Sequence, residues 1–164
     1  MGDVSVREGA SSPREDAIRM LARREYSRLE LVERLTARGY SAEAVNDCLE
    51  ALAEGGLQSD ARFAESFARS RLFRGQGPVK IRAELKRRGL GRERIQDALL
   101  EAEQGAEGDW FALACDALVR RFSGPGDTPR ERARRERFLA QRGFDFDQVR
   151  HALEHAWDSA PDRY

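Results

Sequence analysis

Cysteine, lysine and long apolar runs are scarce in this sequence of 164 residues. No stretch approaches the roughly 20 apolar residues that cross a membrane, so we expect no membrane contact. The start of the chain lacks the charged and apolar regions of a secretory signal, which predicts a cytoplasmic location. Cys48 and Cys115 stand far apart, without a Cys-x-x-Cys spacing or a histidine partner. Neither a disulfide framework nor a zinc finger is therefore predicted, and both thiols are expected among apolar neighbours.

Apolar residues are also fewer than in an average domain. They make up 40% of the chain and charged residues 35%, which is enough to fold but predicts a thin or elongated core. The formal net charge is zero because 29 basic residues balance 29 acidic ones. Only Lys80 and Lys86 are lysines, so the basic residues are almost all arginines.

The spacing of the apolar residues is typical of short amphipathic helices. From Ala17 onward they recur at three and four positions, and strict apolar-polar alternation does not persist. The motif Leu-x-x-Arg-Gly-apolar occurs three times, with its glycine at Gly39, Gly89 and Gly143. Six residues after each glycine comes a β-branched residue, and four further on a leucine. The glycine spacings of 50 and 54 residues predict an all-α fold of three tandem repeats.

Helix-capping residues divide each repeat into three helices. The middle helix of each repeat begins at a cap, and two of these caps match a capping box while two place proline at the first helical position. The three glycines are expected in the left-handed conformation that ends this helix. The capping residues are Ser27 with Glu30, Gly77 before Pro78, and Thr128 before Pro129 with Glu131; Ser41 and Asp145 are expected to cap the third helix.

These signals predict the following organisation. A flexible tail over residues 1–15 precedes repeat 1 at 16–58, repeat 2 at 59–103, a linker at 104–108, repeat 3 at 109–158 and a C-terminal tail at 159–164.

Positive charge concentrates in the second and third repeats. Residues 62–94 contain eleven basic residues and three acids, a net charge of +8, and residues 120–142 contain eight and three, a net charge of +5. A charge run is usually a solvated helix face. Here the bases are nearly all arginines in neighbouring repeats, and the planar arginine fork suits phosphate and carboxylate partners. We therefore predict a polyanionic or acidic partner.

Enzyme chemistry has little support in the sequence. His151 and His155 match the H-x-x-E-H pattern of some zinc peptidases, but only nine residues follow His155, too few for a further carboxylate ligand well downstream. The same segment has a structural use through Val149, Leu153 and Trp157. We expect no catalytic residue, no metal and no cofactor.

The chain resembles the RecX regulatory proteins, a family that binds and modulates the RecA recombinase of bacteria. The resemblance is strongest in DARFAESF at 60–67 and GQGPVKIRAEL at 75–85. AIRMLARREYS at 17–27 and FLAQRGF at 138–144 are similar to the opening and closing segments of that family. It extends over about residues 16–157.

The resemblance implies a curved array of three-helix repeats that lies in the groove of the RecA filament on single-stranded DNA. It further implies a regulator, not an enzyme, that inhibits the ATPase, strand exchange and coprotease activities of RecA in recombination and SOS repair. A groove binder needs an extended basic surface. We expect a monomer that makes contacts without base specificity through Arg69, Arg74, Lys80, Arg82, Lys86, Arg88, Arg130, Arg134 and Arg137.

A direct DNA-binding protein is the alternative. Three-helix units with an arginine-rich second helix can imitate helix-turn-helix modules. Tight, sequence-dependent duplex binding in the absence of RecA would favour it.

Overall fold

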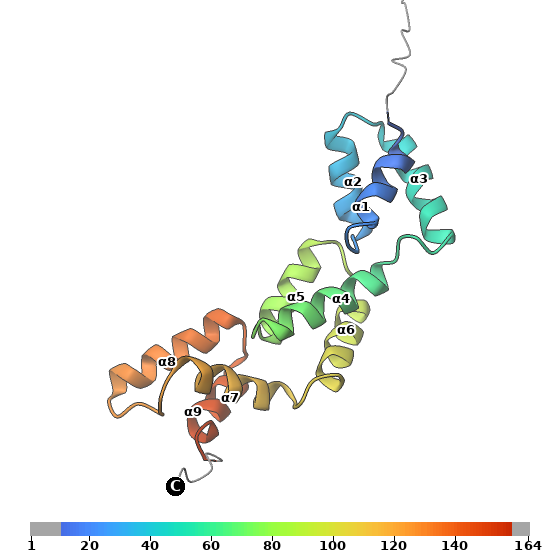
Figure 1. Cartoon of the computed structure of the whole chain (residues 1–164). Helices are drawn as coiled ribbons and strands as arrows, with labels where there is room; N and C mark the ends of the chain where they lie inside the picture. Colours follow the sequence, from blue (N-terminus) through green and yellow to red (C-terminus); the bar gives the residue numbers. More distant parts are fainter. Residues whose placement is uncertain (1–10, 159–164) are drawn as a thin grey trace, which may run out of the picture. The chain divides into compact units, whose positions relative to one another are not determined.

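The computed structural model describes residues 11–158, which contain nine helices and no strand (Figure 1). The predicted all-α fold with three three-helix repeats in tandem is confirmed. The chain divides into two compact units between Phe63 and Ala64, and each unit is described by itself. None of the helices in the described range combines the length and apolarity that a bilayer crossing needs.

The first unit contains α1 (Pro13–Leu21), α2 (Arg28–Ala37), α3 (Ala42–Glu54) and the beginning of α4 (Asp60–Phe73). Its core is made by apolar residues spaced three and four apart on α2 and α3, as the sequence predicted. Leu31, Leu35, Val45, Leu49 and Leu52 are fully buried.

Helix α1 begins earlier than predicted. The Ser12 hydroxyl accepts a hydrogen bond from the Glu15 amide at 3.1 Å, and Pro13 occupies the first turn. Residues 13–15 are therefore helical, and the boundary predicted for a flexible tail at 1–15 was wrong. The rest of that tail up to residue 10, and the C-terminal tail at 159–164, lie outside the described residues.

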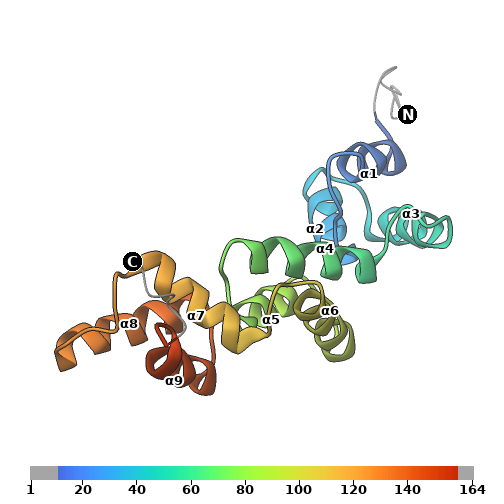
Figure 2. The same ribbon diagram turned by 60° about the horizontal axis from the view of Figure 1, so that its bottom comes forward.

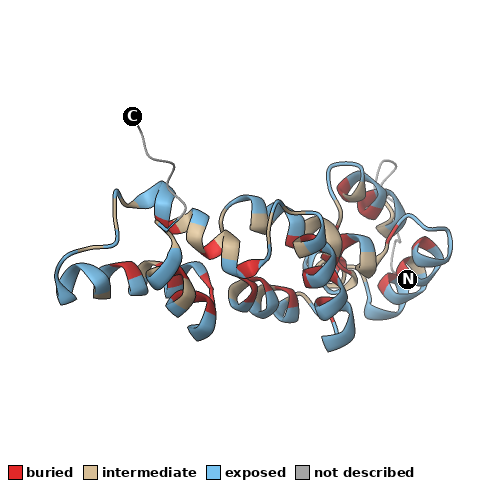
Figure 3. Cartoon of the chain, turned by 90° about the horizontal axis from the view of Figure 1, so that it is seen from below, coloured by how far each residue is buried: buried red, intermediate tan, exposed pale blue. Residues whose placement is uncertain are grey.

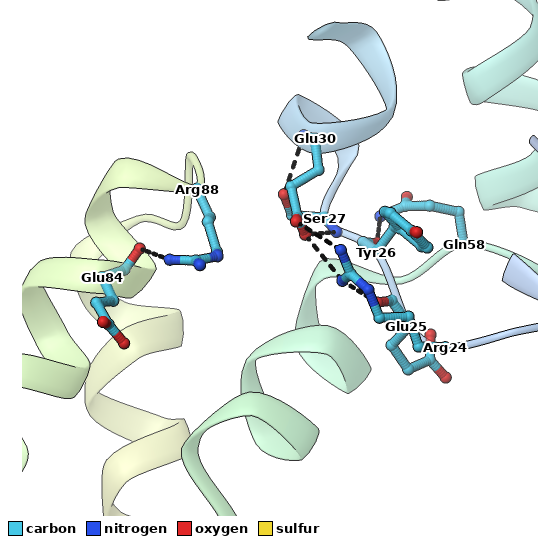
Figure 4. A network of polar contacts seen from close by, with 8 residues as sticks. All are labelled: Arg24, Glu25, Tyr26, Ser27, Glu30, Gln58, Glu84 and Arg88. Atoms are coloured by element: carbon cyan, nitrogen blue, oxygen red, sulfur yellow. Dashed lines mark hydrogen bonds and ion pairs between the residues drawn. The ribbon is translucent and has the colours of Figure 1, made fainter. Parts of the chain in front are cut away.

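Polar side chains fix the start of α2 in the first unit (Figure 4). Ser27 and Glu30 form the predicted capping box, with hydrogen bonds of 3.1 and 3.2 Å. Arg24 pairs with Glu30 at 3.1 Å and stacks over Tyr26, 3.6 Å from the ring centre. Gln58 donates to the backbone carbonyl of Tyr26 at 3.3 Å, which ties the end of the repeat to its middle helix.

The second unit contains the remainder of α4 with α5 (Pro78–Arg87), α6 (Arg92–Gln104), α7 (Trp110–Arg121), α8 (Pro129–Arg142) and α9 (Phe146–His155). Helix α6 continues through Gln104, the first residue of the expected linker. Buried residues form narrow stripes along these helices, and the remaining faces are exposed or half-buried (Figure 3). The fully buried residues are Ala68, Ile81, Leu85, Ala114, Leu118, Leu139 and Ala152.

The three repeated glycines adopt the predicted conformation. Gly39, Gly89 and Gly143 have φ values of 96°, 85° and 95°, in the left-handed region that favours glycine. The predicted caps at Ser41, Thr128 and Asp145 are also confirmed, each accepting a hydrogen bond from a backbone amide of its helix.

A backbone joint links α5 to the turn after α8. The amide of Gly77 donates to the carbonyl of Arg142 at 2.7 Å, and the amide of Val79 donates to the carbonyl of Gly143 at 2.9 Å. Gly77 has no side chain that could cap α5, so these two carbonyls satisfy amides that a helix otherwise leaves unpaired. A Cβ at Gly77 would lie 2.5 Å from Gly143 backbone atoms, which explains why the joint needs glycine.

Candidate binding surface

Some basic residues form ion pairs with carboxylates, including Arg71 and Arg150 of the second unit, and others do not. In the first unit Arg24, Arg38 and Arg62 form ion pairs with carboxylates at 3.1 Å. The nine residues predicted to bind a partner all lie in the second unit. Within residues 11–158, none of the nine forms an ion pair with a carboxylate. Their charge is therefore not neutralised by direct pairing with an acidic side chain.

Helix α5 and its C-cap residue Arg88 carry four of the predicted residues in two kinds of environment. Arg82 and Lys86 are exposed and four residues apart, so they share one helix face. Lys80 is half-buried beside the Gly143 turn. Arg88 is half-buried, lies over Phe67 at 4.6 Å and donates to the Glu84 carbonyl at 3.1 Å (Figure 4). Arg82 and Lys86 are thus the better placed of the four for contact with a partner.

Helix α8 carries an exposed stripe of three predicted residues. Arg130, Arg134 and Arg137 follow one another at four and three positions and are exposed. The helix starts at the capping box of Thr128 and Glu131, where backbone hydrogen bonds from Asp127 and Thr128 lower the pKa of the Glu131 carboxyl. The spacing of the stripe and its exposure present three guanidinium groups on one side of α8.

Arg135 lies between these residues in the sequence but points inward. Its side chain is 9% exposed, its Nε donates to the Gly124 carbonyl at 2.8 Å, and its guanidinium lies 4.4 Å from the centre of the Phe122 ring. The ring of Phe122 also meets Phe138 edge-on at 5.6 Å. Arg135 therefore stabilises the loop at 123–127 and closes the core of repeat 3, which has few apolar residues on α8.

Arg69 and Arg74 line a cavity of about 1010 Å³ within the second unit. Three further arginines and a phenylalanine also line this cavity, and none of them was among the predicted binding residues. Phe73 is 86% exposed, and Arg142 donates to the Arg74 carbonyl at 3.4 Å. A sequence signal existed, since Arg69 and Phe73 are four residues apart on one helix face. The additional lining residues are Phe73, Arg120, Arg121 and Arg142.

The two histidines and the two cysteines contact neighbouring side chains or are partly buried. His155 Nδ1 lies 2.7 Å from Asp158 Oδ2, and the His151 ring meets Phe111 edge-on at 5.3 Å. No cluster of three or more potential metal ligands occurs in the part of the chain that the structure describes. Cys48 and Cys115 are half-buried, and burial raises the pKa of both thiols.

Comparison with known proteins decides the family. Residues 14–52, 59–99 and 107–153 match the models of the first, second and third three-helix domains of RecX. The regulatory protein RecX of Chromohalobacter salexigens is 60% identical over 149 residues, covering 91% of this chain and 95% of the relative. This chain belongs to the RecX family. The regulatory protein RecX of Pseudomonas putida is 47% identical, covering 83% of this chain and 85% of the relative.

Solved structures of the family have the same fold. The crystal structure of RecX from Lactobacillus salivarius matches with a TM-score of 0.68 at 20% identity, covering 88% of this chain and 94% of that one. A second RecX crystal structure matches with a TM-score of 0.69 at 22% identity, covering 87% of this chain and 72% of that one. The relatives from Chromohalobacter salexigens and Pseudomonas putida are named regulatory proteins, and the shared domains make this chain a member of the same family.

Proposed function

We propose that this chain is a non-enzymatic, cytoplasmic regulator that binds the RecA filament on single-stranded DNA. In this role it lies in the filament groove and inhibits the ATPase, strand exchange and coprotease activities of RecA during recombination and SOS repair. The family membership supports a regulatory role. The observation that carries the proposal is the set of exposed basic residues on α5 and α8 that pair with no carboxylate of the described chain.

Electrostatics explain how such a surface would act. A filament on single-stranded DNA presents phosphates, and lysine and arginine release condensed counterions when they approach them. Contacts of this kind depend on position and charge and not on base identity. Arg82 and Lys86 on α5, with Arg130, Arg134 and Arg137 on α8, meet this requirement because they are exposed on regular helix faces.

The test is a RecA ATPase assay on single-stranded DNA in which the purified chain is titrated. We expect inhibition that weakens steeply as salt rises, because counterion release contributes to binding. No effect at micromolar excess would contradict the proposal.

Binding to DNA alone provides the second readout. We expect weak binding to any DNA sequence with a steep salt dependence. Tight, sequence-dependent binding to duplex DNA at physiological salt without RecA would instead identify a direct DNA-binding protein.

A further inference from the structure

The proposed function does not use the cavity of the second unit that Arg69 and Arg74 line. It lies among α4, α6, α7 and α8, and its volume of about 1010 Å³ is at the upper end of the range for ligand sites. We propose that this groove binds a protein segment with carboxylates at one end, an apolar anchor in the middle and a basic residue at the other end. The inference deepens the proposed function by specifying how a protein partner is held.

Charge changes sign along the groove. On α4 the lining begins with Glu65 and continues with Arg69, and Arg74 follows directly after the helix, about 13 Å from Glu65 at the rise of an α-helix. On α7 they run from Asp116 to Arg120. Figures 1 and 2 show both helices running toward the side of the unit where α8 lies, so the arginines occupy the same end. A segment of one charge would be repelled at one end, whereas a segment with both charges is complementary to the whole groove.

The basic end offers arginines without acidic partners. Arg74 and Arg120 are exposed, and neither forms an ion pair with a carboxylate within residues 11–158. Arg142 adds a third guanidinium there, since it bonds to the Arg74 carbonyl at 3.4 Å. Guanidinium groups accept carboxylates in a bidentate geometry, which suits aspartate and glutamate side chains of a partner.

The acidic end holds two carboxyl groups in contact. Burial, and the hydrogen bond and charge of Glu101, raise the pKa of the Glu65 carboxyl, and the positive charge of Arg69 offsets part of this rise. Two carboxyl groups this close favour a proton or another cation between them. A lysine or arginine of a partner can supply that positive charge.

Apolar side chains make up another part of the groove lining. Leu72, Leu113, Ala117 and Phe138 line it, and Phe73 at its rim is 86% exposed. An exposed phenylalanine of this size gains free energy when a partner removes it from water. The lining combines four carboxylates with five arginines, a mixture that complements a polypeptide carrying both charges better than a uniformly negative phosphate backbone.

The experiment measures fluorescence anisotropy of labelled peptides with the full chain. The probe is a synthetic peptide of about 15 residues with acidic residues at one end, a Phe-x-x-Leu anchor and a lysine at the other end. One control peptide replaces the anchor by serines, and another replaces the acids by glutamines. We expect the probe to bind about tenfold more tightly than either control peptide.

Two groove variants test the placement of the peptide. We expect Arg74→Glu with Arg120→Glu, and separately Phe73→Ala, to weaken binding of the probe by about tenfold or more. The matched controls lie outside the lining: Arg92→Glu with Arg94→Glu for charge, and Phe146→Ala, at 74% exposure, for an exposed ring. These controls should bind the probe as the wild-type chain does.

Three results would overturn the inference: equal binding of all peptides, equal loss in groove and control variants, or displacement of the probe by a short oligothymidylate.

None of these measurements contains RecA. A chain that binds the probe but leaves RecA ATPase unchanged would contradict the proposed function alone, and a chain that inhibits RecA without binding the probe would contradict this inference alone.

Discussion

The turns at Gly89 and Gly143 have the same sequence motif and the same backbone conformation, but their surroundings differ. Both glycines have left-handed φ values, 85° and 95°, and both follow a helix that ends in arginine. Gly89 is exposed, whereas Gly143 is buried. A Cβ at Gly143 would collide with the Cβ of Lys80 and lie 2.8 Å from the Lys80 amide nitrogen.

The comparison distinguishes a glycine that is required by the turn within its own repeat from one that is also required by contact with the neighbouring repeat. The left-handed turn is a local property, because it ends a helix in every repeat. The close approach at Gly143 is a tertiary property, because that turn supplies the carbonyls that cap α5. The turn of the first repeat has a different contact. Arg38 and Tyr40, the residues on either side of its glycine, bind the buried carboxylate of Asp16.

The largest effect is expected for alanine at Gly143. Gly89→Ala adds only the strain of a left-handed residue, about 1–2 kcal/mol in the free energy of unfolding. Gly143→Ala adds a collision with Lys80 to the same strain, so we expect a loss of about 3 kcal/mol or more. Urea denaturation of both variants measures the difference, and equal losses would show that the joint at α5 is not tightly packed.

Arginine neighbours on α8 provide the next contrast. Arg135→Ala removes hydrogen bonds to the carbonyls of Gly124 and Glu131, at 2.8 and 2.9 Å, and leaves both buried or part-buried groups without this donor. We expect a loss of about 2 kcal/mol. The exposed control Arg134→Ala should change stability by less than about 0.5 kcal/mol. Thermal unfolding of the two variants decides whether Arg135 is structural, and a larger loss for Arg134→Ala would reverse the assignment.

The turn of the first repeat should show a pH dependence. The hydrogen bond from Tyr40 at 2.7 Å, with help from Arg38, holds the pKa of the buried Asp16 carboxyl below its ordinary value of 3.8. A lowered pKa in the folded state stabilises the fold above that ordinary value and loses this contribution as the pH falls through the folded-state pKa. Tyr40→Phe should therefore cost about 1–2 kcal/mol at neutral pH and less at low pH.

Urea denaturation of wild-type protein and Tyr40→Phe at neutral pH and at pH values below the ordinary pKa of aspartate measures this effect. If the difference between the two proteins stayed constant or grew on acidification, the hydrogen bond to the ionised carboxylate would not be its source.

The smallest effect on stability is expected on the exposed face of α5. Arg82→Glu with Lys86→Glu removes no contact with the described chain that would hold the helix, so each substitution should change the free energy of unfolding by less than about 0.5 kcal/mol. Circular dichroism during urea titration checks this value. A large loss would mean that these two side chains stabilise the fold and are not reserved for a partner.

Local features of the fold could be predicted from the sequence, whereas the contacts between repeats could not. The capping box at Ser27 and Glu30 and the left-handed Gly143 depend on residues within one turn of each other, so their signals are readable in the chain. The joint of Gly77 with Gly143 brings together residues far apart in sequence. It could not be predicted because a glycine before proline is already explained locally, as the start of a helix.

The charge pattern predicted which segments carry the candidate surface, but not which way the individual side chains point. Periodicity did not distinguish inward Arg135 from outward Arg134, because α8 has too few apolar residues to define its buried face. Charge density also could not show that Arg88 packs on Phe67, or that Arg74 shares a cavity with Arg142. Which of the nine predicted residues bind a partner stays a prediction.

The most direct test of the proposed surface compares two sets of charge reversals in the RecA ATPase assay on single-stranded DNA. Arg130→Glu, Arg134→Glu and Arg137→Glu together change the α8 stripe, and Arg92→Glu with Arg94→Glu changes exposed arginines outside the predicted surface. We expect the α8 variant to need at least about tenfold more protein for half-inhibition, and the control to inhibit as the wild-type chain does. Wild-type inhibition by a folded α8 variant would contradict the account.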